Sequence, residues 1–311
     1  MQIRDFIAKL VSRIGQDRVM HIGDWLWQLH VREDKLSAAQ ENLRIWTGAD
    51  GQIQGFCWFQ SGRMEIQVDP AASPAGEIER EMLAWAIGRQ ATDADAATGD
   101  LSADAFEHDV RKIAILADLG FHITGDDRYD IFWQDLRFRH FEGKTPPGAT
   151  VRAVDIDREL EDRVAIHREV WSPSRFTAMS YAAVRAAPGY LPELDLVAVA
   201  PDGTIAAYCI CWYDPINRIG EFEPVGARER FRRQGYGLAV MYEGLRRLQD
   251  LGATKAMVVS SATNAASHGL YSRSGFTVTG QYRAYIRRTG TATDGAGGRT
   301  ESTVPLSRLP A

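Results

Sequence analysis

The sequence has few cysteines and no long apolar segment. Cysteine occurs at three positions, Cys57, Cys209 and Cys211, and a small odd number of cysteines is typical of a reducing compartment rather than of a disulfide-stapled secreted domain. No stretch approaches the roughly 18 consecutive apolar residues of a membrane span. The N-terminal residues alternate charged and apolar side chains and lack the apolar core of a secretory signal. We therefore expect a cytoplasmic protein without a membrane partner.

Neither sign of charge dominates the sequence. The net charge is −5, from 36 basic and 41 acidic residues, whereas non-specific binding to nucleic acid requires a strong positive field. A metal site also lacks support, because Cys209 and Cys211 lie in an apolar run and no paired Cys or His cluster supplies further ligands. We expect no nucleic-acid partner and no metal, and we expect these two cysteines to be buried on one face of a strand.

The chain does contain two successive copies of one order of elements. Its 311 residues suit two domains of about 140 residues each better than one. In each half, helical periodicity precedes alternating strand patterns, a turn and an amphipathic helix. We predict an α/β fold with α+β mixed sheets in two tandem domains, residues 1–142 and 149–288, and a disordered tail at 289–311.

Two short matches support the repeat. Residues 55–59 (GFCWF) parallel residues 207–212 (AYCICW), and Leu119-Gly120-Phe121 parallels Ser274-Gly275-Phe276. Residues 91–108 are rich in Ala, Asp and Thr and are predicted to form a loop. Residues 121–123 are predicted to begin a strand.

The strongest chemical signal is a predicted strand that leads through a glycine-punctuated loop into a helix. The strand covers residues 221–225 (EFEPV), and the loop and helix start cover 232–239 (RRQGYGLA). Such a loop turns successive backbone N–H groups toward one point, and the helix dipole adds positive potential there. Gly235 and Gly237 lack the Cβ atoms that would keep a diphosphate away. Taken alone, the pattern also fits an ordinary strand-to-helix turn.

A second motif lies 27 residues after Gly237 and covers residues 264–276 (NAASHGLYSRSGF). Together the two segments resemble the GNAT acetyltransferase superfamily. Its loop signature is R/Q-x-x-G-x-G/A, and its second segment reads N-x-x-A/S-x-x-L-Y-x-x-x-G-F. The second segment is matched at Asn264, Ser267, Leu270, Tyr271, Gly275 and Phe276.

The resemblance implies acetyl-CoA as co-substrate and implies roles for residues of this chain. The loop amides would cradle the CoA pyrophosphate, and the end of the strand would pair with the pantetheine arm. Asn264 would hydrogen-bond the pantetheine, and Tyr271, unless it is a plain core tyrosine, would protonate the departing thiolate. The implied cofactor-binding residues are Val225, Gly226, Ala227, Arg232, Arg233, Gln234, Gly235, Tyr236, Gly237, Leu238, Asn264 and Ser267.

Two carboxylates precede the loop on the same predicted strand. An acceptor amine must lose a proton before it attacks the acyl carbon, and strand alternation places Glu221 and Glu223 on one face. Either can be the catalytic base, and either can instead pair with a nearby arginine. Mutual repulsion would raise the pKa of one of them.

The first half lacks these signals. Its corresponding loop, residues 69–76 (DPAASPAG), has no basic residue and no G-x-G pattern, and Pro70 and Pro74 carry no amide donor. We expect this half not to bind CoA productively, but to support the second half and wall its acceptor pocket. The arrangement resembles mycothiol synthase-type members of the family, whose chemistry lies in the C-terminal copy.

The sequence therefore predicts an N-acetyltransferase. It would transfer an acetyl group from acetyl-CoA to a primary amine, on a small molecule or a peptide N-terminus, by direct attack in a ternary complex. Two alternatives stay open: a CoA-binding regulatory protein without turnover, and an acyltransferase for a longer acyl group or a hydroxyl acceptor. Four aromatic residues are expected either to line the acceptor side or to be core residues: Trp171, Tyr190, Trp212 and Tyr213. No oligomeric state is predicted.

Overall fold

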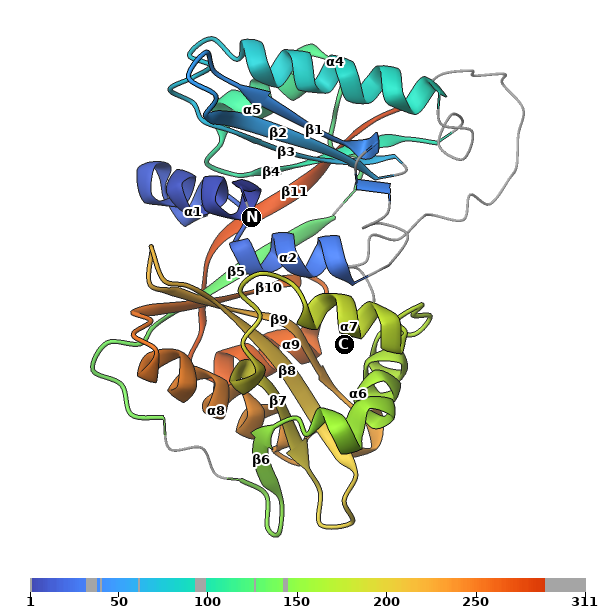
Figure 1. Ribbon diagram of the computed structural model, residues 1–311, viewed down its shortest axis with the longest axis vertical. Helices are drawn as coiled ribbons and strands as arrows, with labels where there is room; N and C mark the ends of the chain where they lie inside the picture. The colour runs from blue at the N-terminus through green and yellow to red at the C-terminus, as the bar shows by residue number, and fades with distance from the viewer. Residues whose placement is uncertain are drawn as a thin grey trace.

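The computed structural model describes residues 2–31, 38–39, 41–60, 62–92, 99–125, 127–141 and 145–288. One mixed sheet of eleven strands runs through this part of the chain, and helices pack on it (Figure 1). The elements of the first half are α1 (Gln2–Ile14), η1 (Gln16–Arg18), α2 (Ile22–His30), β1 (Leu43–Thr47), β2 (Ile53–Gln60), β3 (Arg63–Val68), α4 (Glu77–Thr92), β4 (Leu101–Phe106), α5 (Val110–Asp118) and β5 (Arg128–Asp135).

The second half repeats this order after an additional first strand. Its elements are β6 (Thr150–Ala153), α6 (Ile156–Val170), α7 (Ala178–Arg185), η2 (Pro192–Leu194), β7 (Asp195–Val199), β8 (Ile205–Asp214), β9 (Ile219–Ala227), η3 (Glu229–Phe231), α8 (Tyr236–Asp250), β10 (Lys255–Ser261), α9 (Ala265–Arg273) and β11 (Thr277–Arg287).

The two halves exchange their last strands. The order across the sheet is β1-β2-β3-β4-β11-β5-β10-β9-β8-β7-β6. β11 pairs antiparallel with β4, and the whole of β10 pairs antiparallel with residues 129–135 of β5. The first half is therefore completed by a strand from the second half, and the second half by a strand from the first. The predicted boundary between two domains, after residue 142 and before residue 149, stays a prediction. One continuous sheet contains strands from both sides of it.

Helices cover both faces of the second half. β7 is buried along its whole length, as expected for a strand with packed side chains on each side. Leu196 and Ala198 belong to one apolar cluster with residues of α8, whereas Val197 and Val199 belong to another with residues of α6. Alternate side chains of β7 therefore pack into two different apolar clusters, one on each face of the sheet.

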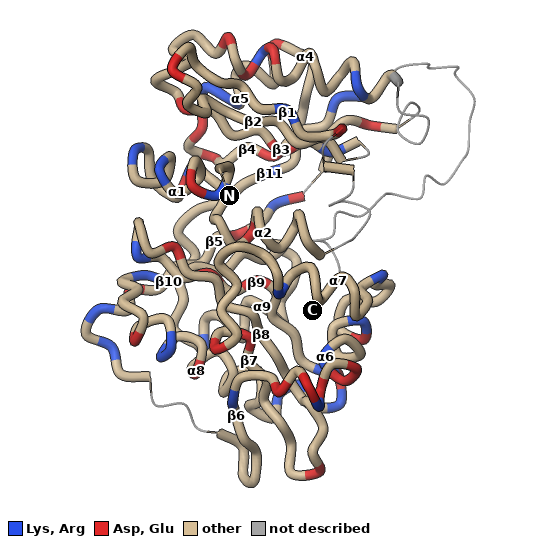
Figure 2. The backbone as a smooth tube through the Cα atoms, in the orientation of Figure 1, with Lys and Arg blue, Asp and Glu red and all other residues tan. Residues whose placement is uncertain are grey.

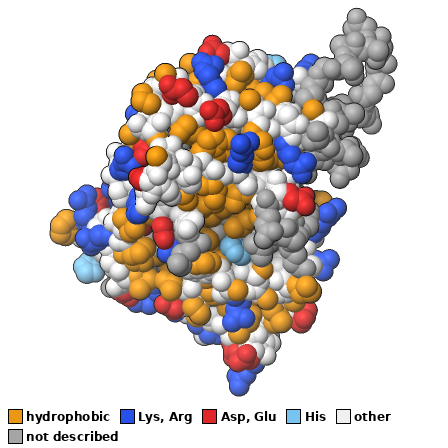
Figure 3. Space-filling model, turned by 45° about the horizontal axis from the view of Figure 1, so that its top comes forward, with side chains coloured by type: hydrophobic (Ala, Val, Ile, Leu, Met, Phe, Trp, Pro, Cys, Tyr) orange, Lys and Arg blue, Asp and Glu red, His pale blue; other side chains and the backbone are white. Residues whose placement is uncertain are grey.

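Charge and apolar surface follow this layering. Charged side chains are frequent along α1, α4, α6 and α8 and sparser along the central strands (Figure 2). In the space-filling view, hydrophobic side chains gather across the middle of the face, with charged side chains around them (Figure 3). Within the described ranges, each helix is too short or too polar to cross a bilayer.

The backbone confirms the predicted repeat at the ends of α5 and α9. Gly120 and Gly275 both have a positive φ, 80° and 97°, as glycine at the C′ position of a helix often does. Phe121 N–H donates to Leu116 O at 2.9 Å, and Phe276 N–H donates to Tyr271 O at 3.0 Å. The same helix-ending motif therefore occurs in both halves.

Three sequence predictions need correction or lie outside the described residues. Residues 91–108 are not all loop, because β4 occupies Leu101–Phe106 with alternate residues buried; its small alanines conceal the strand pattern. Near residues 121–123 there is one isolated bridge, His122 to Ile286, instead of a strand. The tail at 289–311 lies beyond the described residues.

Candidate active site

The site begins where two parallel strands separate. β9 and β10 pair at three positions, Ile219, Gly220 and Glu221 with Lys255, Ala256 and Met257. Beyond Glu221 their pairing ends, while β9 stays paired with β8 and β10 stays paired with β5. One edge of β9 from Phe222 onward therefore faces an open wedge instead of a paired strand.

A cavity of about 290 Å³ lies at this wedge. This volume is at the small end of the range for ligand pockets. Residues from both halves of the chain surround it. The lining residues are Asp24, Gln28, Tyr129, Trp171, Glu221, Glu223, Val225, Val259, Ser260, Ser261, Thr263, Asn264, Ala265, Ser267, Tyr271 and Tyr282.

Glu221 connects the wedge to α2, which lies at the middle of the molecule where the halves meet (Figure 1). Its Oε2 lies 2.8 Å from His21 Nδ1 and accepts a hydrogen bond from Asp24 N–H at 2.8 Å. Burial lowers the pKa of His21, but the Glu221 carboxylate outweighs it, and the pKa is raised from its usual value. Glu221 is thus held by the N-terminus of a first-half helix, and not by an arginine as the sequence allowed.

Glu223 has a different environment two residues further along β9. Its side chain lines the cavity and has no hydrogen-bond or ion-pair partner among the described residues. Burial, with the neighbouring charges of Asp24 and Glu221, raises its pKa well above the usual value for a carboxyl group. A carboxyl group with a raised pKa is suited to take up a proton near neutral pH.

Asp24 is a cavity residue that the sequence analysis missed. It lies in the first turn of α2, and its Oδ1 accepts a hydrogen bond from Gln28 Nε2 at 2.8 Å. Burial and the charge of Glu221 raise its pKa to about 7. The i, i+4 spacing of Asp24 and Gln28 is common on exposed helices. The sequence around Asp24 therefore gives no sign that it contacts Glu221, which lies 197 residues further along the chain.

The second motif contributes Tyr271, Asn264 and Ser267 to the cavity. Tyr271 is 6% exposed, packs edge-on against Phe132, and has no partner for its hydroxyl among the described residues. Asn264 caps α9 by accepting from Ser267 N–H at 3.1 Å. The Ser267 hydroxyl bonds to Ser260 and to Asn264 O, so Ser267 is already satisfied by protein atoms.

The glycine loop has the backbone of an anion-binding turn. Arg233 and Gly235 both have a positive φ, 61° and 95°, directly before α8, and such turns form concave arrays of N–H groups. In the described chain, the amides of Gly237 and Leu238 donate no hydrogen bond to a protein acceptor. No acidic residue lies in the first turn of α8. The loop therefore fits a phosphate group, as the resemblance implies.

The loop arginines divide into two groups. Arg228 is engaged with Ile205 O and Glu169, and Arg230 bonds to Thr204. Arg232 and Arg233 are exposed, and the Arg232 side chain makes one long contact, 3.4 Å, to Ala227 O. The exposed pair, which the sequence analysis named, can reach an anion beside the loop.

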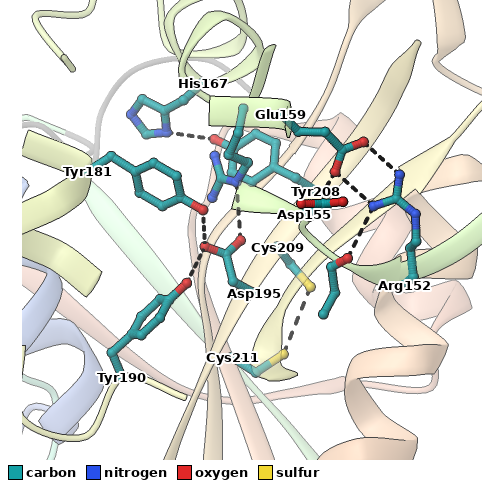
Figure 4. A network of polar contacts seen from close by, with 12 residues as sticks. Arg152, Asp155, Glu159, His167, Tyr181, Tyr190, Asp195, Tyr208, Cys209 and Cys211 are labelled. Carbon is teal, nitrogen blue, oxygen red and sulfur yellow. Dashed lines mark hydrogen bonds and ion pairs between the residues drawn. The ribbon is translucent and has the colours of Figure 1, made fainter. Parts of the chain in front are cut away.

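Asp195 lies at the centre of a polar network between the strands and helices of the second half (Figure 4). Asp195 accepts hydrogen bonds from the Tyr181 and Tyr190 hydroxyls and pairs with Arg163. The Arg163 guanidinium lies 4.0 Å from the centre of the Tyr208 ring. The Tyr208 hydroxyl accepts a hydrogen bond from Trp171 Nε1 at 2.8 Å. The network thereby fixes the orientation of Trp171, which lines the cavity.

The other predicted aromatic residues have structural contacts. Tyr190 belongs to the Asp195 network, and Trp212 is buried and donates its indole N–H to Glu223 O at 2.7 Å. Tyr213 packs against the core beneath α8. Cys209 and Cys211 are both buried, with their sulfur atoms 3.9 Å apart, which confirms the predicted burial. Only Trp171 of the four aromatics lines the cavity.

Comparisons with known proteins agree with this geometry. Residues 157–276 match the model of the acetyltransferase (GNAT) family, while no curated protein matches the chain. A tandem GNAT protein from the clavulanic acid biosynthesis pathway, solved without AcCoA, has a TM-score of 0.65 at 15% identity and covers 94% of this chain and 95% of its own. A GCN5-related N-acetyltransferase from Sphaerobacter thermophilus has a TM-score of 0.62 at 16% identity, with coverage of 86% and 90%.

The similar structures share the fold of this chain, and the wedge and the glycine loop lie within the residues that match the family model. This similarity to the GNAT acetyltransferase family covers residues 157–276 of the chain. The predicted family, the α/β fold class with tandem copies and the acyltransferase class are confirmed.

Proposed function

We propose that the protein is an acetyl-CoA-dependent N-acetyltransferase with one active site, in the wedge between β9 and β10. One observation carries this proposal: Glu223 and Tyr271, whose carboxyl and hydroxyl groups have no hydrogen-bond partner among the described residues, line the same cavity at the point where the strands separate. The small cavity favours a small primary amine over a peptide N-terminus.

The residues divide into a binding set and a reacting set. The loop amides, with Arg232 and Arg233, would hold the CoA pyrophosphate, and the open edge of β9 at Val225–Ala227 would pair with the pantetheine arm. Asn264 would contact the same arm with its amide nitrogen, because its Oδ1 already caps α9. Acetyl-CoA supplies the acyl group as an activated thioester.

Glu223 is the proposed general base, which is a choice between the two carboxylates, Glu221 and Glu223, that the sequence left open. Glu221 is less suited, because its Oε2 already accepts from Asp24 N–H and contacts His21. Glu223 accepts a proton from the acceptor ammonium, and the neutral amine attacks the acyl carbon directly. Tyr271 donates its hydroxyl proton to the departing sulfur, and the second proton, which the attacking nitrogen loses as the amide forms, restores the Tyr271 hydroxyl. Burial, together with the nearby Glu223 charge, raises the pKa of Tyr271, so the hydroxyl keeps its proton until the thiolate leaves.

The proposal is tested by following release of free thiol from acetyl-CoA in the presence of a panel of small primary amines. The expected result is release that depends on the amine and saturates with it. Tight binding of acetyl-CoA without amine-dependent release would overturn the proposal in favour of a regulatory CoA-binding protein. Release that requires alcohols, or a longer acyl-CoA, would replace the proposed acceptor or acyl group.

A further inference from the structure

The cavity has an uncompensated negative character. Its lining includes the carboxyl groups of Asp24, Glu221 and Glu223 and, among the described residues, no lysine, arginine or histidine. Burial and then the charge of Glu221 raise the pKa of Asp24, and burial and then the charges of Asp24 and Glu221 raise the pKa of Glu223. A cavity of this composition attracts a cation and repels an anion.

One of the three carboxylates is already satisfied by the protein. Glu221 contacts His21, which carries a raised pKa, and accepts from a backbone amide at the start of α2. Its charge is thus offset by groups outside the cavity. The remaining pair, Asp24 and Glu223, has no such offset.

Among the described residues, Asp24 forms no ion pair. Its side-chain contact is the neutral Gln28 amide. Arg63 on β3 does lower the pKa of Asp24, but as the smallest of the influences on it. The Arg63 guanidinium is paired with Asp104 at 2.6 Å. Asp24 therefore presents a partly buried carboxyl group to the cavity with a free second oxygen.

A second feature independently indicates a ligand at the same place. The Tyr271 side chain is more than nine-tenths buried, lines the cavity, and has no partner for its hydroxyl among the described residues. The aromatic rings of Trp171, Tyr129 and Tyr282 also line the cavity. Aromatic rings can contact the methylene chain of an amine and can offer their faces to an ammonium group.

We propose that the acceptor carries two cationic centres, as a short linear diamine does, and that Asp24 determines this specificity. The inference rests on the proposed function. The reacting ammonium gives its proton to Glu223 and becomes neutral before attack, so it cannot offset Asp24 during the reaction. A second ammonium, which keeps its charge, pairs with Asp24 throughout. Such a charge-assisted hydrogen bond favours a dication over a monoamine of equal length.

The experiment compares three acceptors that share a four-carbon chain, with the wild-type protein: 1,4-diaminobutane, 4-amino-1-butanol and butylamine. Thiol release gives kcat/KM for each, and calorimetry gives the affinity of each for the protein without acetyl-CoA. The diamine should exceed both monoamines about tenfold or more in kcat/KM and in affinity, as a charged hydrogen bond implies. Equal values for diamine and butylamine would overturn the inference and leave the proposed function intact. No release with any amine would overturn both.

A variant assigns the preference to one residue. In Asp24→Asn, the ratio of diamine to butylamine kcat/KM should fall to near one, while Glu161→Gln, on the exposed side of α6, should keep the wild-type ratio. The Asp24 backbone amide that holds Glu221 is unchanged in this variant. A ratio that persists in Asp24→Asn would assign the second cation elsewhere and contradict the inference. The comparison of three acceptors with wild-type protein remains decisive if the variant fails to fold.

Discussion

The two halves of the molecule contain the same wedge with different contents. β3 and β4 also run parallel and pair only at Arg63–Ser102 and Met64–Ala103 before they separate. A cavity of about 170 Å³ lies there, smaller than the cavity of about 290 Å³ in the second half. The backbone alone therefore does not make an active site, and the side chains that enter each wedge decide what it can hold.

The third residue after the helix cap, in α5 and in α9, accounts for much of the difference between the two wedges. Lys112 and Ser267 each lie three residues after a helix cap, and each donates its amide to that cap, Asp109 or Asn264. Lys112 Nζ crosses the first wedge and donates to Ile66 O at 3.0 Å. Ser267 is short and leaves the edge of β9 open. A strand edge occupied by a lysine cannot pair with an extended ligand.

The helix that follows each wedge differs as well. The first turn of α4 carries Glu77 and Glu79. Glu77 accepts from Ala75 N–H, and Ser73 bonds to Glu79. These carboxylates occupy the positive end of α4. α8 has no acidic residue in its first turn, so its amides remain available to an external anion.

The strands themselves carry different acids. Trp58 pairs with Glu65 as Trp212 pairs with Glu221, which aligns Gln67 with Glu223. Gln67 Nε2 donates to Glu65 Oε1 at 2.6 Å, so an amide stands where the second half has its proposed base. At this position the first wedge thus has an amide instead of a carboxylate, and the edge of its strand is occupied by Lys112.

The largest predicted effect comes from making β9 resemble β3. Glu223→Gln keeps the size of the side chain but removes the proton acceptor, and we expect kcat/KM to fall about 10²- to 10⁴-fold. The wild-type rate should rise with pH through the raised pKa of Glu223, because only the carboxylate can accept a proton, and the variant should lose this rise. Thiol release from pH 5 to 9 measures both, with Glu161→Gln as control. A variant within tenfold of wild type would remove Glu223 from the mechanism.

A smaller effect concerns Asp24, which lines the cavity of the second wedge. The pKa of Asp24 is raised from 3.8 to about 7 in the folded protein. The folded state therefore binds more protons than the unfolded state between these values, and stability falls as the pH rises through that window. Asp24→Asn should stabilise the protein at pH 8 by about 1 to 3 kcal/mol, allowing for partial exposure, and have little effect near pH 4.

Denaturant unfolding at the two pH values measures this difference. Glu161→Gln, which removes an exposed carboxylate, should show no such pH dependence. Equal stability of Asp24→Asn and wild type at pH 8 would show that the Asp24 carboxylate is not destabilised in the fold.

The smallest predicted effect is in the first wedge. Lys112→Met removes the hydrogen bond to Ile66 O and should cost about 1 kcal/mol of stability. It should leave amine-dependent thiol release unchanged, because Lys112 lies outside the second wedge. It should not create a second acetyl-CoA site either, because Glu77 and Glu79 still occupy the start of α4. A second binding event in the variant would show that Lys112 alone closes the first wedge.

Much of the second half could be predicted from the sequence. The apolar run of β8, the helix Ala265–Arg273 and the glycine loop have local patterns, and the structure has each of them. The exchange of β5 and β11 could not be predicted, because the same alternating pattern fits either neighbouring strand. Asp24 and His21 could not be predicted as neighbours of Glu221, because their proximity arises from packing of α2 between the halves.

The most direct test of one active site per chain is the stoichiometry of acetyl-CoA binding by titration calorimetry. A Cβ at Gly237 would meet only Leu270 atoms at 3.5 Å, so Gly237→Glu should fold and place a carboxylate at the start of α8. Gly88→Glu, in an open position on α4, is the matched control. We predict one site in wild type and in Gly88→Glu, and binding weakened about tenfold or more in Gly237→Glu. Two sites in wild type, or one site unaffected by Gly237→Glu, would contradict the assignment.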